Sequence, residues 1–145
     1  MSYRFGKASV VCVGGLKEAY LKAAQEEFLK RLGSYGKLII IEVKDEASIA
    51  ARLSKGSYKI ALDVGGTAFS SEEMAAHLSK LAVEGHSNLE FIIGGSHGLL
   101  PETLKTCNLR LSMSNMTFTH QMVRIILLEQ LYRACRILNN EPYHK

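Results

Sequence analysis

Residues 111–145 read LSMSNMTFTHQMVRIILLEQLYRACRILNNEPYHK. A loop of small hydroxyl, amide and thioether side chains at residues 112–119 leads into a long apolar segment. Between residues 119 and 138 the apolar side chains recur at helical spacing, and they cover a wider arc than the single stripe of a surface helix. We therefore expect a helix that is covered on two sides, by the sheet of its own chain and by a second copy of the chain.

Arg124 interrupts the apolar pattern of this helix. It lies in the same i, i+4, i+7 row as Leu128 and Leu131. We expect its guanidinium to lie among apolar atoms and to need an anionic or carbonyl partner. Arg133 and Arg136 instead share the polar side of the helix, which is typical of a solvated face. The pattern favours a functional or interface role for Arg124.

Length and composition set the limits on the fold. The chain has 145 residues, of which 47% are apolar, and a net charge of +4. This predicts a single domain over residues 1–145 with a core of its own. The charge is compatible with a nucleic-acid partner but does not predict one. The sequence shows no secretion signal and no apolar run of membrane length, so we expect a cytoplasmic protein without a membrane partner.

The cysteines argue against a disulfide framework and against a zinc site. Cys12, Cys107 and Cys135 are odd in number, widely spaced and without a C-x-x-C pair. We expect each to be a small buried residue in a protein of the reducing cytosol, and we expect no metal site.

Strand and helix signals alternate along the chain. Apolar and β-branched runs predict strands at residues 8–13, 37–43, 58–64 and 89–93, with a poorer fifth strand near 108–113. Helical spacing or capping signals predict helices at residues 16–32, 45–53 and 70–81, and a short one through residue 104. This alternation predicts an α/β fold, a mainly parallel sheet flanked by helices.

Three loops follow the predicted strands at one edge of this sheet, where parallel α/β proteins bind their ligands. They are residues 62–67, 94–101 and 113–120, all rich in Gly, Ser, Thr or Asn. None has the G-x-G-x-x-G order of a dinucleotide site or the G-K-[ST] of a P-loop. Each glycine pair alone is a weak signal, but their coincidence at one edge indicates a binding site.

Several motifs carry a resemblance to a known family. They are IGGSHG at 93–98, LSMSNMTFTHQMVRIILLEQLYRA at 111–134, EPYHK at 141–145, LD-x-x-G at 62–66 and SSEE at 70–73. With these motifs the whole chain resembles the SPOUT-class methyltransferases that methylate N(3) of a pseudouridine in bacterial 23S ribosomal RNA. One departure is Thr119, where that family usually has proline before the histidine.

The resemblance implies a fold with a C-terminal trefoil knot, a homodimer, and S-adenosylmethionine as the methyl donor. It assigns binding of this cofactor to Leu62, Gly94, Met113, Ser114, Asn115, Met116, Thr117 and Phe118. It assigns the catalytic positions to His120, Arg124, Tyr143 and His144. Methylation of a pyrimidine N(3) requires loss of the ring proton, so His120 and His144 are the two candidate general bases.

A small chain with limited surface favours recognition of a folded ribosomal surface by shape, so we expect the assembled ribosome to be the substrate. The basic residues that could contact phosphates are Arg4, Lys7, Arg124, Arg133, Arg136 and Lys145. Two alternatives stay open: a SPOUT-fold methyltransferase of transfer RNA, and a non-catalytic dimer that binds RNA or ribosomes.

Overall fold

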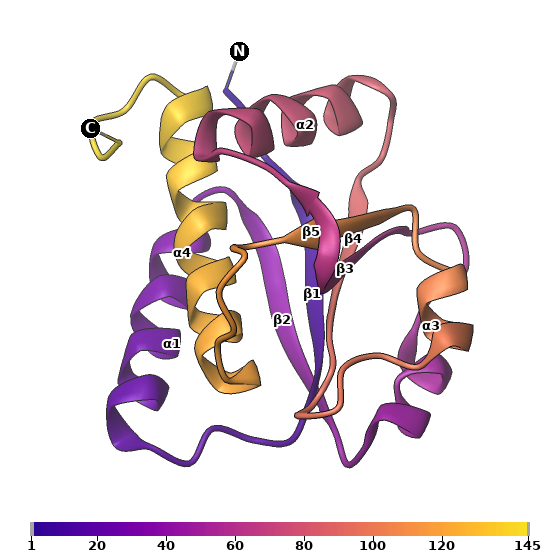
Figure 1. The fold of residues 1–145 in the computed structure, drawn as a ribbon. Coiled ribbons are helices and arrows are strands. Elements are labelled where there is room, and N and C mark those ends of the chain that lie inside the picture. Colours follow the sequence, from indigo (N-terminus) through magenta and orange to yellow (C-terminus); the bar gives the residue numbers. More distant parts are fainter. Residues whose placement is uncertain (1, 145) are drawn as a thin grey trace.

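The computed structural model describes residues 2–144, and its strands and helices alternate along the chain (Figure 1). The elements are β1 (Gly6–Val13), α1 (Ala19–Leu32), β2 (Gly36–Val43), the 3-10 turns η1 (Glu46–Ser48) and η2 (Ala50–Arg52), β3 (Tyr58–Ala68), α2 (Ser71–Val83), β4 (Asn88–Ile93), α3 (Pro101–Lys105), β5 (Leu109–Ser112) and α4 (His120–Leu138).

The five strands form one sheet in the order β2-β1-β4-β3-β5, and every neighbouring pair is parallel. The prediction of an α/β fold with a mainly parallel sheet is therefore confirmed. All five strands end at the same edge, called the carboxyl edge below. The trefoil knot that the resemblance implies stays a prediction.

Two local predictions need correction. Residues 45–53 form two 3-10 turns instead of an α-helix, because the Asp45 carboxylate accepts hydrogen bonds from the Ser48 N–H at 2.9 Å and the Ser48 hydroxyl at 2.6 Å and holds a tight turn. β3 does not end before its glycine pair. The register with β5 jumps between Leu62 and Thr67, so residues 63–66 bulge out before the strand resumes.

The two faces of the sheet are covered very differently (Figure 1). The helical face carries Val10 and Phe91 into the main core, where α1, α2 and α4 cover them. The opposite face, called the rear face below, carries Val11 and Ile92 into a smaller cluster under Ile49, near the 3-10 turns and α3. Helical cover is thus concentrated on one side.

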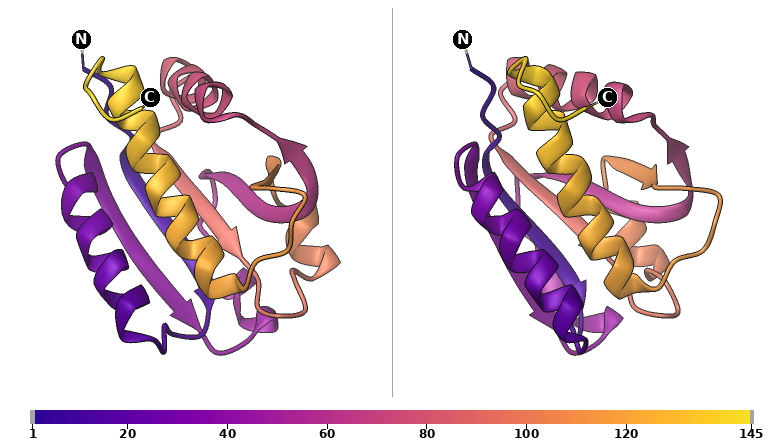
Figure 2. Two further views of the ribbon diagram at one scale, coloured as in Figure 1. Left: turned by 60° about the vertical axis from the view of Figure 1, so that its left-hand side comes forward. Right: turned by 90° about the vertical axis from the view of Figure 1, so that its left-hand side faces the viewer.

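α4 lies between α1 and α2 on the helical face (Figure 2). Its buried residues are Arg124, Ile125, Leu127, Leu128, Leu131, Ala134 and Cys135. The N-terminal segment is joined to the far end of this helix, where the Tyr3 N–H donates to Asn139 Oδ1 at 2.8 Å. Met122 remains 38% exposed, so cover by a second copy of the chain stays a prediction.

All three cysteines are free thiols, two of them buried and Cys107 half-buried. Burial raises the pKa of Cys12 to about 11 and that of Cys135 to about 12, and it also raises the pKa of Cys107. Each thiol is therefore protonated at neutral pH and is a poor nucleophile. Within residues 2–144, no helix is long and apolar enough to cross a membrane.

Candidate functional site

A pocket of about 970 Å³ opens at the carboxyl edge of the sheet. Its walls come from the bulge after Leu62 in β3, the loop at residues 93–99 after β4, and the loop between β5 and α4. These are the three loops that the sequence placed at one edge. The prediction that they come together is confirmed.

The loop between β5 and α4 is held by its own hydroxyl groups. Ser112 Oγ donates to the Ser114 carbonyl at 3.0 Å, and Ser114 Oγ accepts from the Met116 N–H at 3.0 Å. At the end of the loop, Thr119 Oγ1 accepts from the Met122 N–H at 3.2 Å. Thr119, which stands where the family usually has proline, therefore caps α4 and fixes the entry into the helix.

The loop after β4 turns back closely on its own backbone. A Cβ atom added to Gly94 would lie 2.4 Å from the Gly98 carbonyl oxygen, so no side chain fits there. The turn is completed by Gly98, whose φ of +77° favours glycine and whose N–H donates to the Gly95 carbonyl at 3.0 Å. The glycines of IGGSHG thus shape one wall of the pocket.

Most of the residues to which the resemblance assigns cofactor binding meet in this pocket. Those that line it are Leu62, Gly94, Met113, Ser114, Met116, Thr117 and Phe118. Asn115 belongs to the same loop but is not among the lining residues. Met116 and Phe118 are 72% and 39% exposed, so they lie at the mouth of the pocket.

The first turn of α1 also contributes to the pocket, which the sequence analysis missed. Glu18, Tyr20 and Leu21 line it, and Tyr20 is 68% exposed. The signal was present, since this turn follows the Gly14–Gly15 break after β1 and so lies at the carboxyl edge too. Glu18 and Asp63 add two carboxylates to walls that are otherwise largely apolar.

The predicted catalytic residues of α4 lie in different surroundings. His120, the first residue of the helix, lines the pocket. Arg124, one turn further on, is 0% exposed and is not a lining residue. Its Nη1 donates to Glu42 Oε2 at 2.7 Å and its Nη2 donates to the Gly14 carbonyl at 2.8 Å. The expected anionic and carbonyl partners are both present.

Tyr143 lies near the opposite end of α4. Its hydroxyl donates to Glu129 Oε2 at 2.9 Å, and its ring lies under the Arg133 guanidinium at 4.7 Å. Burial, followed by the hydrogen bond to Glu129, raises the pKa of Tyr143, so its hydroxyl remains a proton donor at neutral pH. At 1.5 Å per residue, Glu129 and Arg133 lie roughly 14 and 20 Å along the helix from His120.

His144 has contacts at both ring nitrogens. Nδ1 lies 3.2 Å from Arg133 Nη1, and Nε2 lies 3.2 Å from Glu72 Oε1. Because arginine can only donate, Nδ1 accepts the hydrogen bond from Arg133. Nε2 therefore donates its hydrogen to Glu72 Oε1. Within one chain, therefore, His120 reaches the pocket whereas Tyr143 and His144 do not.

The sequence matches known proteins over nearly its whole length. Residues 7–144 match the family model described as predicted SPOUT methyltransferase. The ribosomal RNA large subunit methyltransferase H of Clostridioides difficile is 50% identical, over 94% of this chain and 98% of that protein. The protein of the same name from Desulforamulus reducens is 44% identical, over 96% of this chain and 99% of that protein.

Two solved structures share the fold. A probable methylase family protein from Haemophilus influenzae Rd KW20 aligns with a TM-score of 0.59 at 16% identity, over 97% of this chain and 71% of that one. A putative methyltransferase from Legionella pneumophila, solved with bound SAM, aligns with a TM-score of 0.50 at 11% identity, over 89% of this chain and 66% of that one. At such low identity these likenesses describe the fold alone. The match from residue 7 to residue 144, together with relatives of up to 50% identity, places this chain in the SPOUT methyltransferase family.

Proposed function

We propose that this chain transfers a methyl group from S-adenosylmethionine to N(3) of a pseudouridine in 23S ribosomal RNA, and that its 145 residues act as a single domain. The observation that carries the proposal is the pocket at the carboxyl edge, whose walls come from the family motifs. The relatives named ribosomal RNA large subunit methyltransferase H support the choice of RNA.

The pocket suits S-adenosylmethionine in size and in chemistry. Its volume of about 970 Å³ lies in the range of small-molecule sites, and such sites combine apolar walls with a few polar groups. Leu62 and Met116 offer apolar contact for an adenine ring, and the backbone of the glycine loop can read its edge. Glu18 and Asp63 place negative charge where a cationic ligand can use it. When bound, the cofactor supplies the electrophilic methyl group.

The residues of the chain then have to orient the base and remove its proton. His120 lies in the pocket wall, so one of its ring nitrogens is our candidate acceptor for the N(3) proton. Alignment of the two reactants lowers the barrier further by several kcal/mol. Arg124 does not line the pocket, so we assign it the role of holding the first turns of α4, and with them His120, against the ends of β1 and β2.

We further propose that the active form is a homodimer. Apolar side chains are exposed around the mouth of the pocket: Tyr20, Met116, Phe118 and Met122. A second copy packed on this rim would bury them. It would also allow the tail of one chain to approach the pocket of the other. Within its own chain, the folded tail does not reach the pocket. In this arrangement Tyr143 and His144 act on the partner's substrate.

The substrate we propose is the assembled 70S ribosome in the cytoplasm. The test is transfer of radiolabelled methyl groups from S-adenosylmethionine to ribosomes that lack this modification, with protein-free ribosomal RNA and transfer RNA in parallel. Label in the large-subunit RNA of intact ribosomes supports the proposal. Label in transfer RNA alone favours the transfer-RNA alternative. Cofactor binding without label in any RNA favours a non-catalytic dimer.

A further inference from the structure

Two lysines lie side by side on the rear face, far from the pocket. Lys7 of β1 pairs in register with Lys37 of β2, so their side chains leave neighbouring strands on the same face, and both are exposed. Like charges directly opposite each other in a sheet are destabilising. Among residues 2–144, neither ammonium group has an ion pair or a side-chain hydrogen bond to offset this repulsion.

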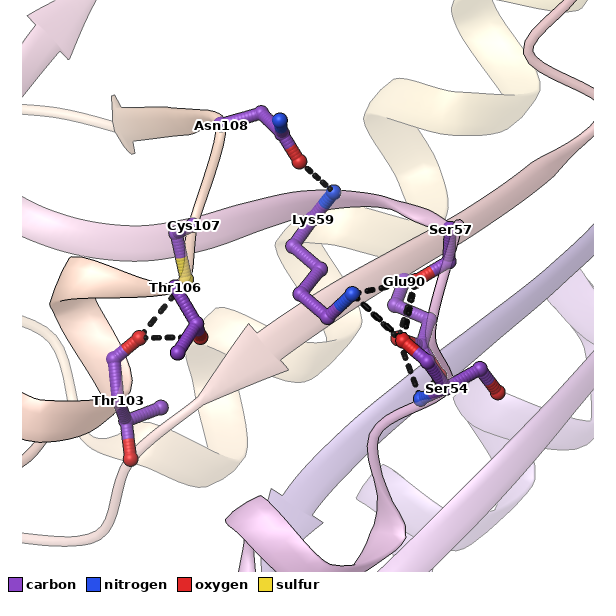
Figure 3. Close-up of polar contacts among 8 residues, drawn as sticks. All are labelled: Ser54, Ser57, Lys59, Glu90, Thr103, Thr106, Cys107 and Asn108. Atoms are coloured by element: carbon purple, nitrogen blue, oxygen red, sulfur yellow. Dashed lines mark hydrogen bonds and ion pairs between the residues drawn. The ribbon is translucent and has the colours of Figure 1, made fainter.

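The next row of the same face contains a buried carboxylate. Glu90 of β4 is 2% exposed, and its register neighbours are Ser9 of β1 and Lys59 of β3. Glu90 accepts the Ser54 N–H at 3.0 Å and the Ser57 hydroxyl at 2.5 Å (Figure 3). These bonds hold the turn between η2 and β3 down against the rear face.

The Glu90 carboxylate forms an ion pair with one nearby lysine, Lys59, but not with another, Lys55. Lys59 Nζ lies 3.8 Å from Glu90 and donates to the Ser54 carbonyl at 2.6 Å (Figure 3). Lys55, by contrast, is exposed at the tip of the turn that Glu90 holds. Within the described part of the chain, no ion pair neutralises it. Lys7, Lys37 and Lys55 together form what we call the rear basic surface.

The other basic residues that the sequence offered as phosphate contacts are already engaged. Arg4 donates to the Ser34 carbonyl, Arg124 is buried against Glu42, and Arg133 and Arg136 hold the C-terminal tail. Lys145 lies outside the described residues. Of that set, Lys7 is the residue whose charged group is free in the part of the chain described here.

We propose that the rear basic surface binds RNA phosphates and forms a second contact with the substrate, distinct from the pocket. The inference rests on the proposed RNA methylation. Unpaired exposed lysines that repel each other are stabilised by a polyanion, and an RNA backbone presents phosphates at regular spacing. Lys7 lies near the start of β1 and the pocket near its end, about 20 Å away along the strand. Contacts here increase affinity without touching the reacting base.

The test compares matched double variants on unmodified ribosomes. Lys7→Ala/Lys37→Ala should raise KM at least about fivefold, leave kcat and cofactor affinity unchanged, and reduce the slope of log affinity against log salt by about 1 for each lost phosphate contact. The control Lys22→Ala/Lys30→Ala removes the same charge from exposed positions of α1 on the helical face. It should leave KM within about twofold of the parent value.

A single charge reversal separates binding from folding. Lys7→Glu places a carboxylate next to the Lys37 ammonium group. Thermal stability should therefore hold or rise, while KM rises. The inference is overturned if the KM and the salt slope of these lysine variants match those of the control while the parent protein still methylates RNA. Weaker binding to ribosomes together with unchanged binding to protein-free ribosomal RNA also overturns it, since an acidic ribosomal protein would then be the partner. A parent protein that methylates no RNA contradicts the proposed function instead.

Discussion

The Arg124 guanidinium lies 2.7 Å from the Glu42 carboxylate, and this ion pair joins the first turns of α4 to the end of β2. The two partners differ in solvent exposure: the Arg124 side chain is 1% exposed, whereas the Glu42 side chain is 44% exposed. Gln25 Oε1 adds a contact at 3.3 Å, while Arg124 Nε has no partner among residues 2–144. A buried charge thus depends on one partly solvated carboxylate for neutralisation.

Removing the carboxylate should therefore destabilise the fold more than removing the guanidinium. Glu42→Ala leaves a buried cation unpaired, and we expect a loss of roughly 2–4 kcal/mol in the free energy of unfolding. Arg124→Met removes the buried charge and leaves a Glu42 that water can reach, so we expect a loss of about 1–2 kcal/mol. Urea unfolding followed by circular dichroism measures both. The reverse order would contradict this account of the pair.

Arg124→Met also tests the catalytic position that the resemblance implies for this residue. If Arg124 acts in catalysis, its loss should lower kcat by about tenfold or more and leave the cofactor Kd almost unchanged. The structural role that its contacts favour predicts that kcat and the cofactor Kd worsen together, since His120 and the loop before it are held by the same helix. Single-turnover kinetics and equilibrium dialysis on the same preparation distinguish these outcomes.

Gly94→Ala should weaken cofactor binding by at least about tenfold, because the new Cβ would lie 2.4 Å from the Gly98 carbonyl oxygen and the loop must move. Gly65→Ala is the matched control at the same edge of the sheet. Its Cβ would lie 3.8 Å from the nearest atom, in the Asp63 side chain. Isothermal titration with S-adenosylmethionine should show parent-like affinity for the control. Equal affinities for both variants would place the ligand elsewhere.

His77 should make the fold sensitive to acid. Burial, with a smaller contribution from Lys80, lowers the pKa of His77 below its ordinary value near 6.5. At a pH between the lowered pKa of His77 in the folded chain and its ordinary pKa in the unfolded chain, the unfolded chain binds a proton that the folded chain does not. Stability is therefore present above pH ~6.5 and falls as the pH drops below it. His77→Gln should lose less stability between about pH 7.5 and pH 5.5 than the parent. An identical loss would rule out this contribution.

Mixed dimers test whether the tail serves the partner's pocket. One chain carries Gly94→Ala and an intact tail, and the other carries His144→Ala and an intact pocket. If tails act across the dimer, the intact pocket receives an intact tail, so one of the two sites works: the purified mixed dimer regains about half of the parent activity, and a statistical 1:1 mixture about a quarter. If each tail serves its own pocket, the mixed dimers stay inactive. Each homodimer alone is the control, and in both cases it should show only the low activity of its own variant.

The sequence predicted the strands and the three loops that meet at the carboxyl edge because these depend on local pattern and on the parallel sheet, whereas the individual pocket residues came from the family resemblance. The capping signal that predicted a helix from residue 70 is the Ser70 and Glu73 capping box, in which each side chain bonds the other residue's backbone N–H. The sequence could not place the tail, because the contacts of His144 with Arg133 and Glu72 join residues from three segments. For the same reason it predicted an anionic or carbonyl partner for Arg124 without identifying Glu42 and Gly14 as those partners.

The rear face shows a second limit of sequence reasoning. Lys7 and Lys37 look like ordinary surface lysines in the sequence, and only the register of β1 against β2 places them next to each other. Apart from Asn88 at its start, the strand that contains Glu90 is otherwise apolar, with nothing nearby in the chain to indicate the partners of Glu90. Ser54 and Ser57 come from a turn more than thirty residues earlier.

The most direct test of the central claim is mass spectrometry of nucleosides from ribosomes that lack the modification, incubated with this protein and S-adenosylmethionine. We expect one methyl group per particle, in the large-subunit RNA, recovered as N(3)-methylpseudouridine. The Gly94→Ala variant should produce much less under the same conditions, and Gly65→Ala should match the parent. Unmodified pseudouridine in the large-subunit RNA, with the cofactor bound and the methyl group absent or found in transfer RNA, would contradict the account.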